Sequence, residues 1–265
     1  MINKPVIGVA VAVVVVAAGT WYYLQSRHAE PARPPEAAQT PPPAEPPAEP
    51  AIQHPLPGGQ APASTAPLPS LADSDPALGD ALRQVVGPAA VKDYLLPESI
   101  IRHLVVTIDN LPRQKVAVQK RPTAAAGGSF VADGDELHAT LNPQNFARYQ
   151  PMVAVIGKLD MRQVAAVYIR FYPLFQQAYQ DLGYPNGYFN DRLVQVIDML
   201  LETPQPAGPI ALARPNVMYV FADPALEARP AGQKLLIRMG PDNAAVIKTK
   251  LDELRTAITA APPKR

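Results

Sequence analysis

The sequence predicts a mainly α-helical domain with small β-hairpin elements, which follows a single-pass transmembrane helix and a disordered proline-rich linker. Three observations predict this fold class. Residues 6–24 form an uncharged apolar run, residues 29–70 hold 14 of the 33 prolines, and the remaining residues place apolar side chains at helical spacing between proline and glycine breaks. We therefore expect an anchor over residues 1–28, a linker over residues 29–70 and one compact helical domain over residues 71–265.

The apolar run is predicted to stay in the lipid bilayer. Val6–Leu24 contains 19 residues without a charge, and at about 1.5 Å per residue a helix of this length spans roughly 28 Å of hydrocarbon. Trp21 and two tyrosines close the run, where aromatic rings favour the membrane interface. The alternative is a cleaved signal peptide with a cleavage site near Ala17–Gly19, but the apolar region of such peptides is usually shorter.

The charges that flank the run give little information on its orientation. Lys4 precedes the run, and Arg27 and Arg33 follow it, which favours a cytoplasmic domain. A very short tail before a lone apolar run is instead the usual layout of a signal anchor. We predict a protein of the bacterial inner membrane with its domain in the periplasm, and a cytoplasmic domain is the alternative.

The linker is predicted to be an extended spacer. Its 42 residues contain few side chains that could be buried, so the entropy lost on ordering is not offset. Proline favours the polyproline II conformation, in which 42 residues reach about 130 Å. Three segments match the PxxP pattern of peptide ligands, namely 31–34, 43–46 and 47–50. A simple spacer explains them better, because such matches are expected by chance in any proline-rich stretch.

The first half of the domain is predicted to contain four helices and a hairpin. Proline at a first turn, polar caps and stopping glycines set the boundaries. The expected helices cover residues 74–86, 89–95, 97–110 and 142–158, and the expected hairpin covers residues 130–141. Ser74 or Asp75 is the expected cap of the first helix.

A long amphipathic helix is predicted to begin at Asp160. Its buried face is expected to consist of side chains spaced by four and three residues, namely Met161, Ala165, Tyr168, Tyr172, Phe175, Tyr179 and Leu182. Pro173 lies inside this helix and is expected to kink or split it. Gly183 is expected to end it in a left-handed conformation.

The second half begins with a turn at residues 184–187 and an apolar helix at residues 188–201. This helix is expected to be central in the core, because its only polar stripe consists of Asp191, Gln195, Asp198 and Glu202. Two short strands, at 209–213 and 217–221, and three helices, beginning at Pro224, Pro230 and Asp242, complete the expected elements.

Motifs for metal, cofactor or covalent chemistry are missing from the sequence. The domain has two histidines, His103 and His138, and no HExxH, EF-hand, phosphate-binding loop or GxSxG pattern. The chain has no cysteine, which rules out disulfides, thiolate zinc sites, iron–sulfur clusters and cysteine nucleophiles. With 24 basic against 23 acidic residues, a nucleic-acid partner is not expected. We predict no catalytic residue, metal or cofactor.

One cluster is predicted to bind a ligand or partner. Polar and aromatic side chains gather at a turn and the following helix start, and neighbouring arginines could join them; the candidates are Tyr184, Asn186, Tyr188, Asn190, Asp191, Arg192 and Arg214. Alternatively, these residues serve as turn and cap residues. Asp191 and Asp198 share one helical face and could form an acid/base pair, or they could form salt bridges to arginines.

Several runs of the domain closely resemble a known bacterial family. They are Leu182–Leu193 (Leu-Gly-Tyr-Pro-Asn-Gly-Tyr-Phe-Asn-Asp-Arg-Leu), Arg214-Pro215, Phe221–Pro224, Gln233–Leu236 and Arg238–Pro241. The family is catalogued as domain of unknown function 3014, and the resemblance covers roughly residues 71–254. It implies the layout of a membrane segment, a proline-rich stretch and a domain. It carries no reaction and no catalytic residue.

The predicted function is that of a non-catalytic envelope protein, an interaction or scaffold protein that presents a helical domain to an unknown envelope partner. The anchor, the spacer and the scarcity of nucleophiles and metal ligands favour this prediction. The alternative is a membrane-tethered hydrolase that acts on a cell-wall or glycan substrate, with Asp191 and Asp198 as its acid/base pair.

Overall fold

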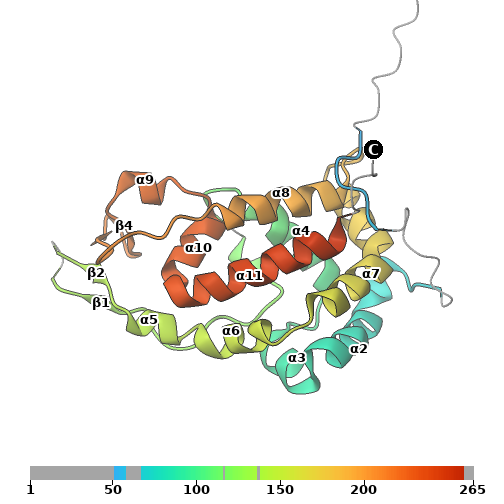
Figure 1. Cartoon of the computed structure of the whole chain (residues 1–265), viewed down its shortest axis with the longest axis horizontal. Helices are drawn as coiled ribbons and strands as arrows, with labels where there is room; N and C mark the ends of the chain where they lie inside the picture. Colours follow the sequence, from blue (N-terminus) through green and yellow to red (C-terminus); the bar gives the residue numbers. More distant parts are fainter. Residues whose placement is uncertain (1–50, 58–66, 116, 136–137, 260–265) are drawn as a thin grey trace, which may run out of the picture. The chain divides into compact units, whose positions relative to one another are not determined.

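The fold is mainly helical, as predicted. The computed structural model describes residues 51–57, 67–115, 117–135 and 138–259, within a compact unit that begins at Glu49. Within these ranges the chain forms ten α-helices, two 3-10 helices and two antiparallel strand pairs (Figure 1). The anchor predicted at Val6–Leu24 lies outside the described residues. In the described ranges, no helix has the length and apolar character needed to cross a membrane.

The helices and strands follow the expected order along the chain. The first half contains η1 (Leu71–Asp73), α2 (Ser74–Val86), α3 (Pro88–Tyr94), α4 (Ile100–Asn110), η2 (Val118–Lys120), β1 (Ala132–Asp133), β2 (Thr140–Leu141), α5 (Gln144–Ala147) and α6 (Gln150–Gly157). The second half contains α7 (Met161–Asp181), α8 (Phe189–Leu201), β3 (Leu212–Ala213), β4 (Val220–Phe221), α9 (Pro224–Glu227), α10 (Ala231–Met239) and α11 (Pro241–Ile258).

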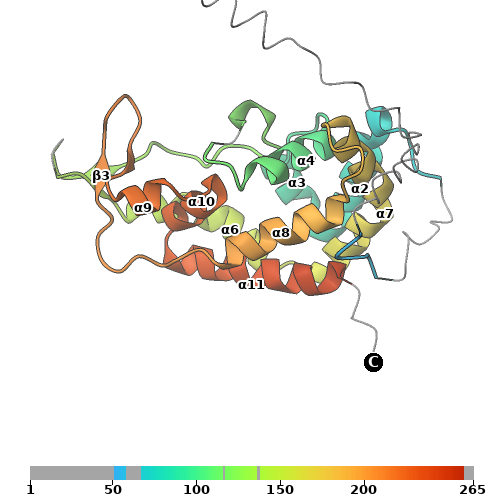
Figure 2. The same cartoon turned by 90° about the horizontal axis from the view of Figure 1, so that it is seen from above.

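Helix α7 is the centre of the core. Asp160 caps it by accepting a hydrogen bond from the Arg162 amide, and Gly183 follows it with φ +114°. The predicted face is buried except for Leu182, which lies just beyond the last turn and is exposed. Pro173 does not split the helix, which runs unbroken to Asp181. Helices α2, α4 and α11 pack against α7, and α11 runs beside α8 (Figure 2).

Two boundary predictions were wrong for identifiable reasons. The helix expected over residues 142–158 is two helices, because Pro151 has no amide hydrogen to donate to the carbonyl four residues earlier. Neither Ser74 nor Asp75 caps α2, because Ser74 is its first residue and Asp75 lies within its first turn. The Asp75 carboxylate accepts hydrogen bonds from the Ser99 and Ile100 amides, at 2.6 and 2.8 Å, and so satisfies the start of α4.

The predicted hairpin and the predicted pair of short strands are both present, each as an antiparallel pair, and they lie next to each other. Strand β1 pairs with β2, and β3 pairs with β4, both antiparallel. The Leu141 amide donates to the Ile210 carbonyl and the Leu212 amide donates to the Ala139 carbonyl, at 2.9 and 2.8 Å, so main-chain bonds join one hairpin to the other. Helix α9 lies beside β4 (Figure 1).

An ion pair at the end of α9 makes stability depend on pH. Glu227 accepts hydrogen bonds from Lys234 Nζ, at 2.7 Å, and from the Phe221 amide, at 3.0 Å. Burial alone would raise the pKa of Glu227, but these hydrogen bonds and the charges of Lys234 and Arg238 outweigh it and leave the pKa below its usual value.

The Glu227→Gln variant is therefore expected to lose stability at neutral pH but not in acid. A lowered carboxylate pKa contributes stability above the pKa of the unfolded chain, and this contribution is lost as the pH falls through the folded pKa. The melting temperatures of wild type and variant, measured from pH 7 to pH 3, should converge as the pH falls. A difference that stays constant or widens in acid would contradict the assignment.

Residues 51–57, named here the strap, correct the prediction of a fully disordered linker. Leu56 is only 2% exposed and belongs to the main hydrophobic core. The Gln53 and His54 amides donate to Asp191 on α8. The burial of Leu56 and these hydrogen bonds oppose the ordering entropy that the proline-rich composition led us to consider decisive.

Candidate functional site

Four of the seven predicted binding residues line one polar pocket. The pocket has a volume of about 380 Å³ and lies where α4 ends, α8 begins and the strap crosses. Its lining consists of Gln53, His54, Asp109, Tyr179, Tyr184, Tyr188, Asp191, Arg192 and Gln195. Tyr184, Tyr188, Asp191 and Arg192 come from the predicted cluster. The structure therefore brings the turn and helix start together with residues far away in the sequence.

The turn that precedes α8 is held by a close contact. The Gly187 amide donates a hydrogen bond to the Tyr184 carbonyl at 3.0 Å, as expected for the predicted turn at residues 184–187. A Cβ atom at Gly187 would lie 2.8 Å from the Tyr179 ring, so only glycine fits here. The Tyr179 and Tyr184 rings stack with centroids 4.5 Å apart. Burial raises the pKa of Tyr179, and the nearby guanidinium of Arg192 lowers it in part.

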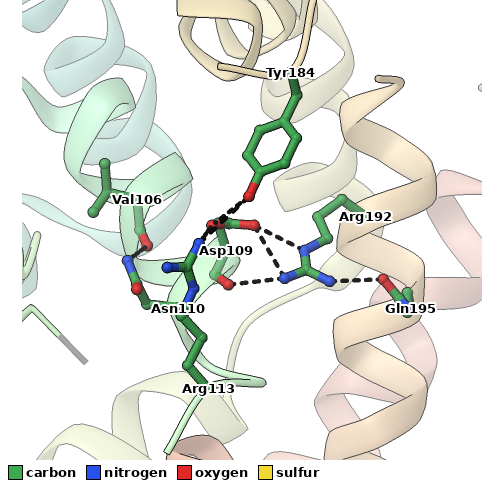
Figure 3. A network of polar contacts seen from close by, with 7 residues as sticks. All are labelled: Val106, Asp109, Asn110, Arg113, Tyr184, Arg192 and Gln195. Carbon is green, nitrogen blue, oxygen red and sulfur yellow. Dashed lines mark hydrogen bonds and ion pairs between the residues drawn. The ribbon is translucent and has the colours of Figure 1, made fainter. Parts of the chain in front are cut away.

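A buried carboxylate organises one side of the pocket. The Asp109 side chain is 2% exposed and accepts hydrogen bonds from Arg113 at 2.7 Å, Arg192 at 3.1 Å and the Tyr184 hydroxyl at 3.3 Å (Figure 3). Arg192 also donates to the Asp109 carbonyl and to Gln195. The hydrogen bond and charge of Asp109 raise the pKa of Arg113. Most of the N–H donors of Arg192 are thus bonded within the protein, chiefly to Asp109.

The two arginines are expected to contribute unequally to stability. The Arg192 side chain is 20% exposed and that of Arg113 is 57% exposed, so water screens the second ion pair more strongly. We expect Arg192→Ala to lower the free energy of unfolding by about 2 to 4 kcal/mol, because it leaves the buried Asp109 short of its main partner. Arg113→Ala should cost clearly less. Urea denaturation of both variants checks this order, and equal losses would contradict it.

The other side of the pocket binds the main chain of the strap. Asp191 accepts from the Gln53 amide at 3.0 Å and from the His54 amide at 2.6 Å. The neighbouring Asn190 donates its side-chain amide to the His54 carbonyl at 2.8 Å. Two adjacent side chains at the start of α8 thus bind two amides and one carbonyl of the bend formed by Gln53 and His54. This arrangement can recognise a polypeptide backbone.

Asn190 also ties the strap to the core. It is fully buried, accepts a hydrogen bond from the Tyr168 hydroxyl at 3.0 Å and donates to the Ile258 carbonyl at 3.1 Å. The side-chain oxygen and amide of Asn190 therefore bridge α7, the end of α11 and the strap. Burial raises the pKa of Tyr168 well above its usual value, so this hydroxyl remains a donor at neutral pH.

The proposed acid/base partner of Asp191 has other contacts. Asp198 forms a two-point ion pair with Arg255 on α11, at 2.5 and 3.2 Å. That bond raises the pKa of Arg255. Seven residues at about 1.5 Å each place Asp191 and Asp198 about 10 Å apart along the helix axis. Among the described residues that line the polar pocket, Asp198 does not occur.

Two further candidates lie apart from the pocket lining. Asn186 is exposed in the turn. Arg214 lies between β3 and β4, where it donates to the Val217 carbonyl at 3.2 Å and its guanidinium is 5.4 Å from the centroid of the Tyr219 ring. His103 is half-buried on α4, and His138 pairs with Asp135. Across the described residues, no group of three or more histidine or acidic side chains could hold a metal ion.

A larger cavity lies elsewhere, between the hairpins, α10 and α11. It has a volume of about 470 Å³ and a mostly apolar lining, with Lys248 donating to the Thr203 carbonyl. It contains none of the predicted binding residues. We place the candidate site at the polar pocket instead, because that pocket combines buried charges with side chains that already bind a segment of chain.

The sequence analysis missed Asp109 and the strap. A signal for Asp109 exists: Ile101, Val105 and Asp109 follow each other at four-residue spacing, and each is 1% exposed. A carboxylate that continues an apolar stripe predicts a buried ion pair. For the strap, the isolated Leu56 between two prolines is the corresponding signal.

Comparison with known proteins gives one match. A family model described as Protein of unknown function (DUF3014) matches residues 100–255. The matched range begins at α4 and includes Asp109, Asn190 and Asp191, whereas the strap precedes it. Neither a curated protein nor a solved structure matches the chain.

Proposed function

The chain belongs to the family described as Protein of unknown function (DUF3014), and we propose that it is a non-catalytic interaction protein tethered to the bacterial inner membrane. In this proposal residues 1–28 anchor the chain, the proline-rich stretch after them is a spacer, and the helical domain lies in the periplasm. The domain presents the polar pocket to a protein partner of the envelope. No catalytic step is required of it.

The main-chain contacts of Asn190 and Asp191 are the observation that carries the proposal. Side chains that bind amide hydrogens and a carbonyl do not depend on the sequence of the bound segment, so they suit the recognition of a polypeptide main chain. Gln53 and His54 form a bend, and Pro55 follows them with a fixed φ and no amide hydrogen. The polar pocket therefore supports binding of a bent segment that contains proline, which in this proposal takes the place of the strap.

The partners of the two carboxylates support binding more than hydrolysis. An acid/base pair needs both carboxylates to face one substrate across a shared cleft. Here Asp191 accepts two main-chain hydrogen bonds and Asp198 is neutralised by Arg255.

A photoreactive amino acid placed at Gln195 of the full chain, in cells that make the protein, tests this function. Gln195 is exposed and lines the pocket, and exposed Gln163 on α7 is a matched control position away from it. We expect a reproducible adduct with one envelope protein at Gln195 and none at Gln163. Equal labelling at both positions would contradict the proposal. Release of glycan fragments by the purified chain, abolished in Asp191→Asn, would instead favour the hydrolase.

A further inference from the structure

A second pocket, distinct from the polar one, is lined almost entirely by hydrocarbon. It lies between the α2–α3 pair and helices α4, α7 and α8 and has a volume of about 330 Å³. Its floor consists of the buried rings of Tyr168, Phe175 and Phe189. The Tyr168 hydroxyl is already bonded to Asn190. No charged side chain lines this apolar pocket, and Thr123 is its only non-aromatic polar residue among the described ones.

The apolar pocket opens to solvent and is not a closed void. Val91, Leu104 and Val167 on its walls are only partly buried, in contrast to the floor. Helix α3 forms one wall, has no fully buried residue and packs mainly against α2. Main-chain hydrogen bonds hold its end in place, since the Leu96 amide donates to Pro122 and the Ala124 amide donates to Tyr94, at 2.8 and 2.9 Å.

The chemistry of the lining decides between classes of occupant. A polypeptide bound in an extended conformation brings amide and carbonyl groups that need partners, and this lining offers almost none. An ordered water also needs two to four polar neighbours. A hydrocarbon chain has no hydrogen-bonding group that would need a partner, and its binding would bury the apolar side chains that line the pocket. A cavity of roughly 150 Å³ takes up benzene, so about twice that volume suits a chain of roughly ten carbons.

We propose that the apolar pocket binds a linear hydrocarbon chain of roughly ten carbons, with any polar head group outside the pocket near Thr123. The chain can belong to a free fatty acid or alcohol, or to the acyl group of a membrane lipid. These sources share one chemistry in the apolar pocket and differ only outside it. The proposal uses none of the residues that bind the strap and stands apart from the proposed function.

Photoaffinity labelling of the full chain in membranes tests the proposal. The probe is decanoate with a diazirine on its alkyl chain, and the modified residues are mapped by mass spectrometry. We expect saturable adducts on the segments that contain Val91 and Val167, on opposite walls of the apolar pocket. Competition by unlabelled decanoate and decanol points to a free chain, and competition by phospholipid vesicles with ten-carbon acyl chains points to a lipid.

Filling the pocket gives the decisive comparison. Val167→Phe is expected to reduce labelling of the lining at least tenfold while the melting temperature stays equal or rises, because the ring occupies space that is otherwise empty. Val91→Phe fills the pocket from the other wall and covers the case in which the first variant does not fold. Val217→Phe, at a position 79% exposed in the β3–β4 hairpin, is the matched control and should label as wild type.

Three results would overturn the proposal. The first is labelling of the lining that does not saturate or is no stronger than labelling elsewhere on the domain. The second is unchanged labelling in both folded filling variants. The third is protection of the apolar pocket by concentration-dependent self-association, with no labelling of the lining in the monomer, since a second copy would then be its occupant.

Discussion

Replacing Asp109 by alanine is expected to lower the free energy of unfolding by about 3 to 5 kcal/mol. The carboxylate is 2% exposed and is the shared acceptor for two arginines and Tyr184. Its removal leaves the mostly buried guanidinium of Arg192 without a counter-charge, which costs far more than the ion pair itself contributes. Urea denaturation with linear extrapolation measures the loss.

A surface ion pair is the matched control for Asp109. Asp181 pairs with Arg102 at 3.0 Å, but both side chains are nearly half exposed. Asp181→Ala removes the same kind of group and is expected to cost less than about 1 kcal/mol. If the two alanine variants lose equal stability, Asp109 does not organise the pocket as described.

Asn190→Ala is expected to cost about 2 to 4 kcal/mol, the second largest effect. The change removes hydrogen bonds to Tyr168, His54 and Ile258 at once. It leaves the Tyr168 hydroxyl and the Ile258 carbonyl buried without that partner, and unsatisfied buried groups cost more than the bonds contribute. It should also release the strap, which limited proteolysis after residue 52 would detect as faster cleavage.

Asn186→Ala is the control for this prediction. Asn186 lies four residues away in the preceding turn but is exposed, so its replacement should change stability by less than about 0.5 kcal/mol. A small effect at Asn190 together with unchanged proteolysis of the strap would show that the asparagine does not hold the chain segment.

Local patterns predicted most of the fold. The four- and three-residue spacing of apolar side chains correctly predicted which face of α7 is buried. The helix also starts directly after Asp160, where the pattern begins. The turn at residues 184–187 and both hairpins also follow from nearby residues. These features depend on interactions within a few residues, which is the range that a sequence pattern describes.

The parts that were missed depend on partners far away in the sequence. Asp75 caps a helix that begins 25 residues later, and Asp191 binds amides more than 130 residues earlier. The proline content of the linker suggested an unburied chain, yet Leu56 enters the core. A periodic pattern of apolar residues does not reveal such long-range contacts. The polar cluster predicted from the sequence nevertheless contains four of the residues that line the polar pocket.

Residue-resolved amide hydrogen exchange of the full chain tests the central claim, that the start of α8 binds the main chain of the strap. We predict that the Gln53 and His54 amides exchange slowly in the wild type, because each donates to Asp191. In Asp191→Ala both amides should exchange fast while the amides of α7 stay protected. Exchange of both amides at the rate of an unstructured peptide in the wild type would contradict the account.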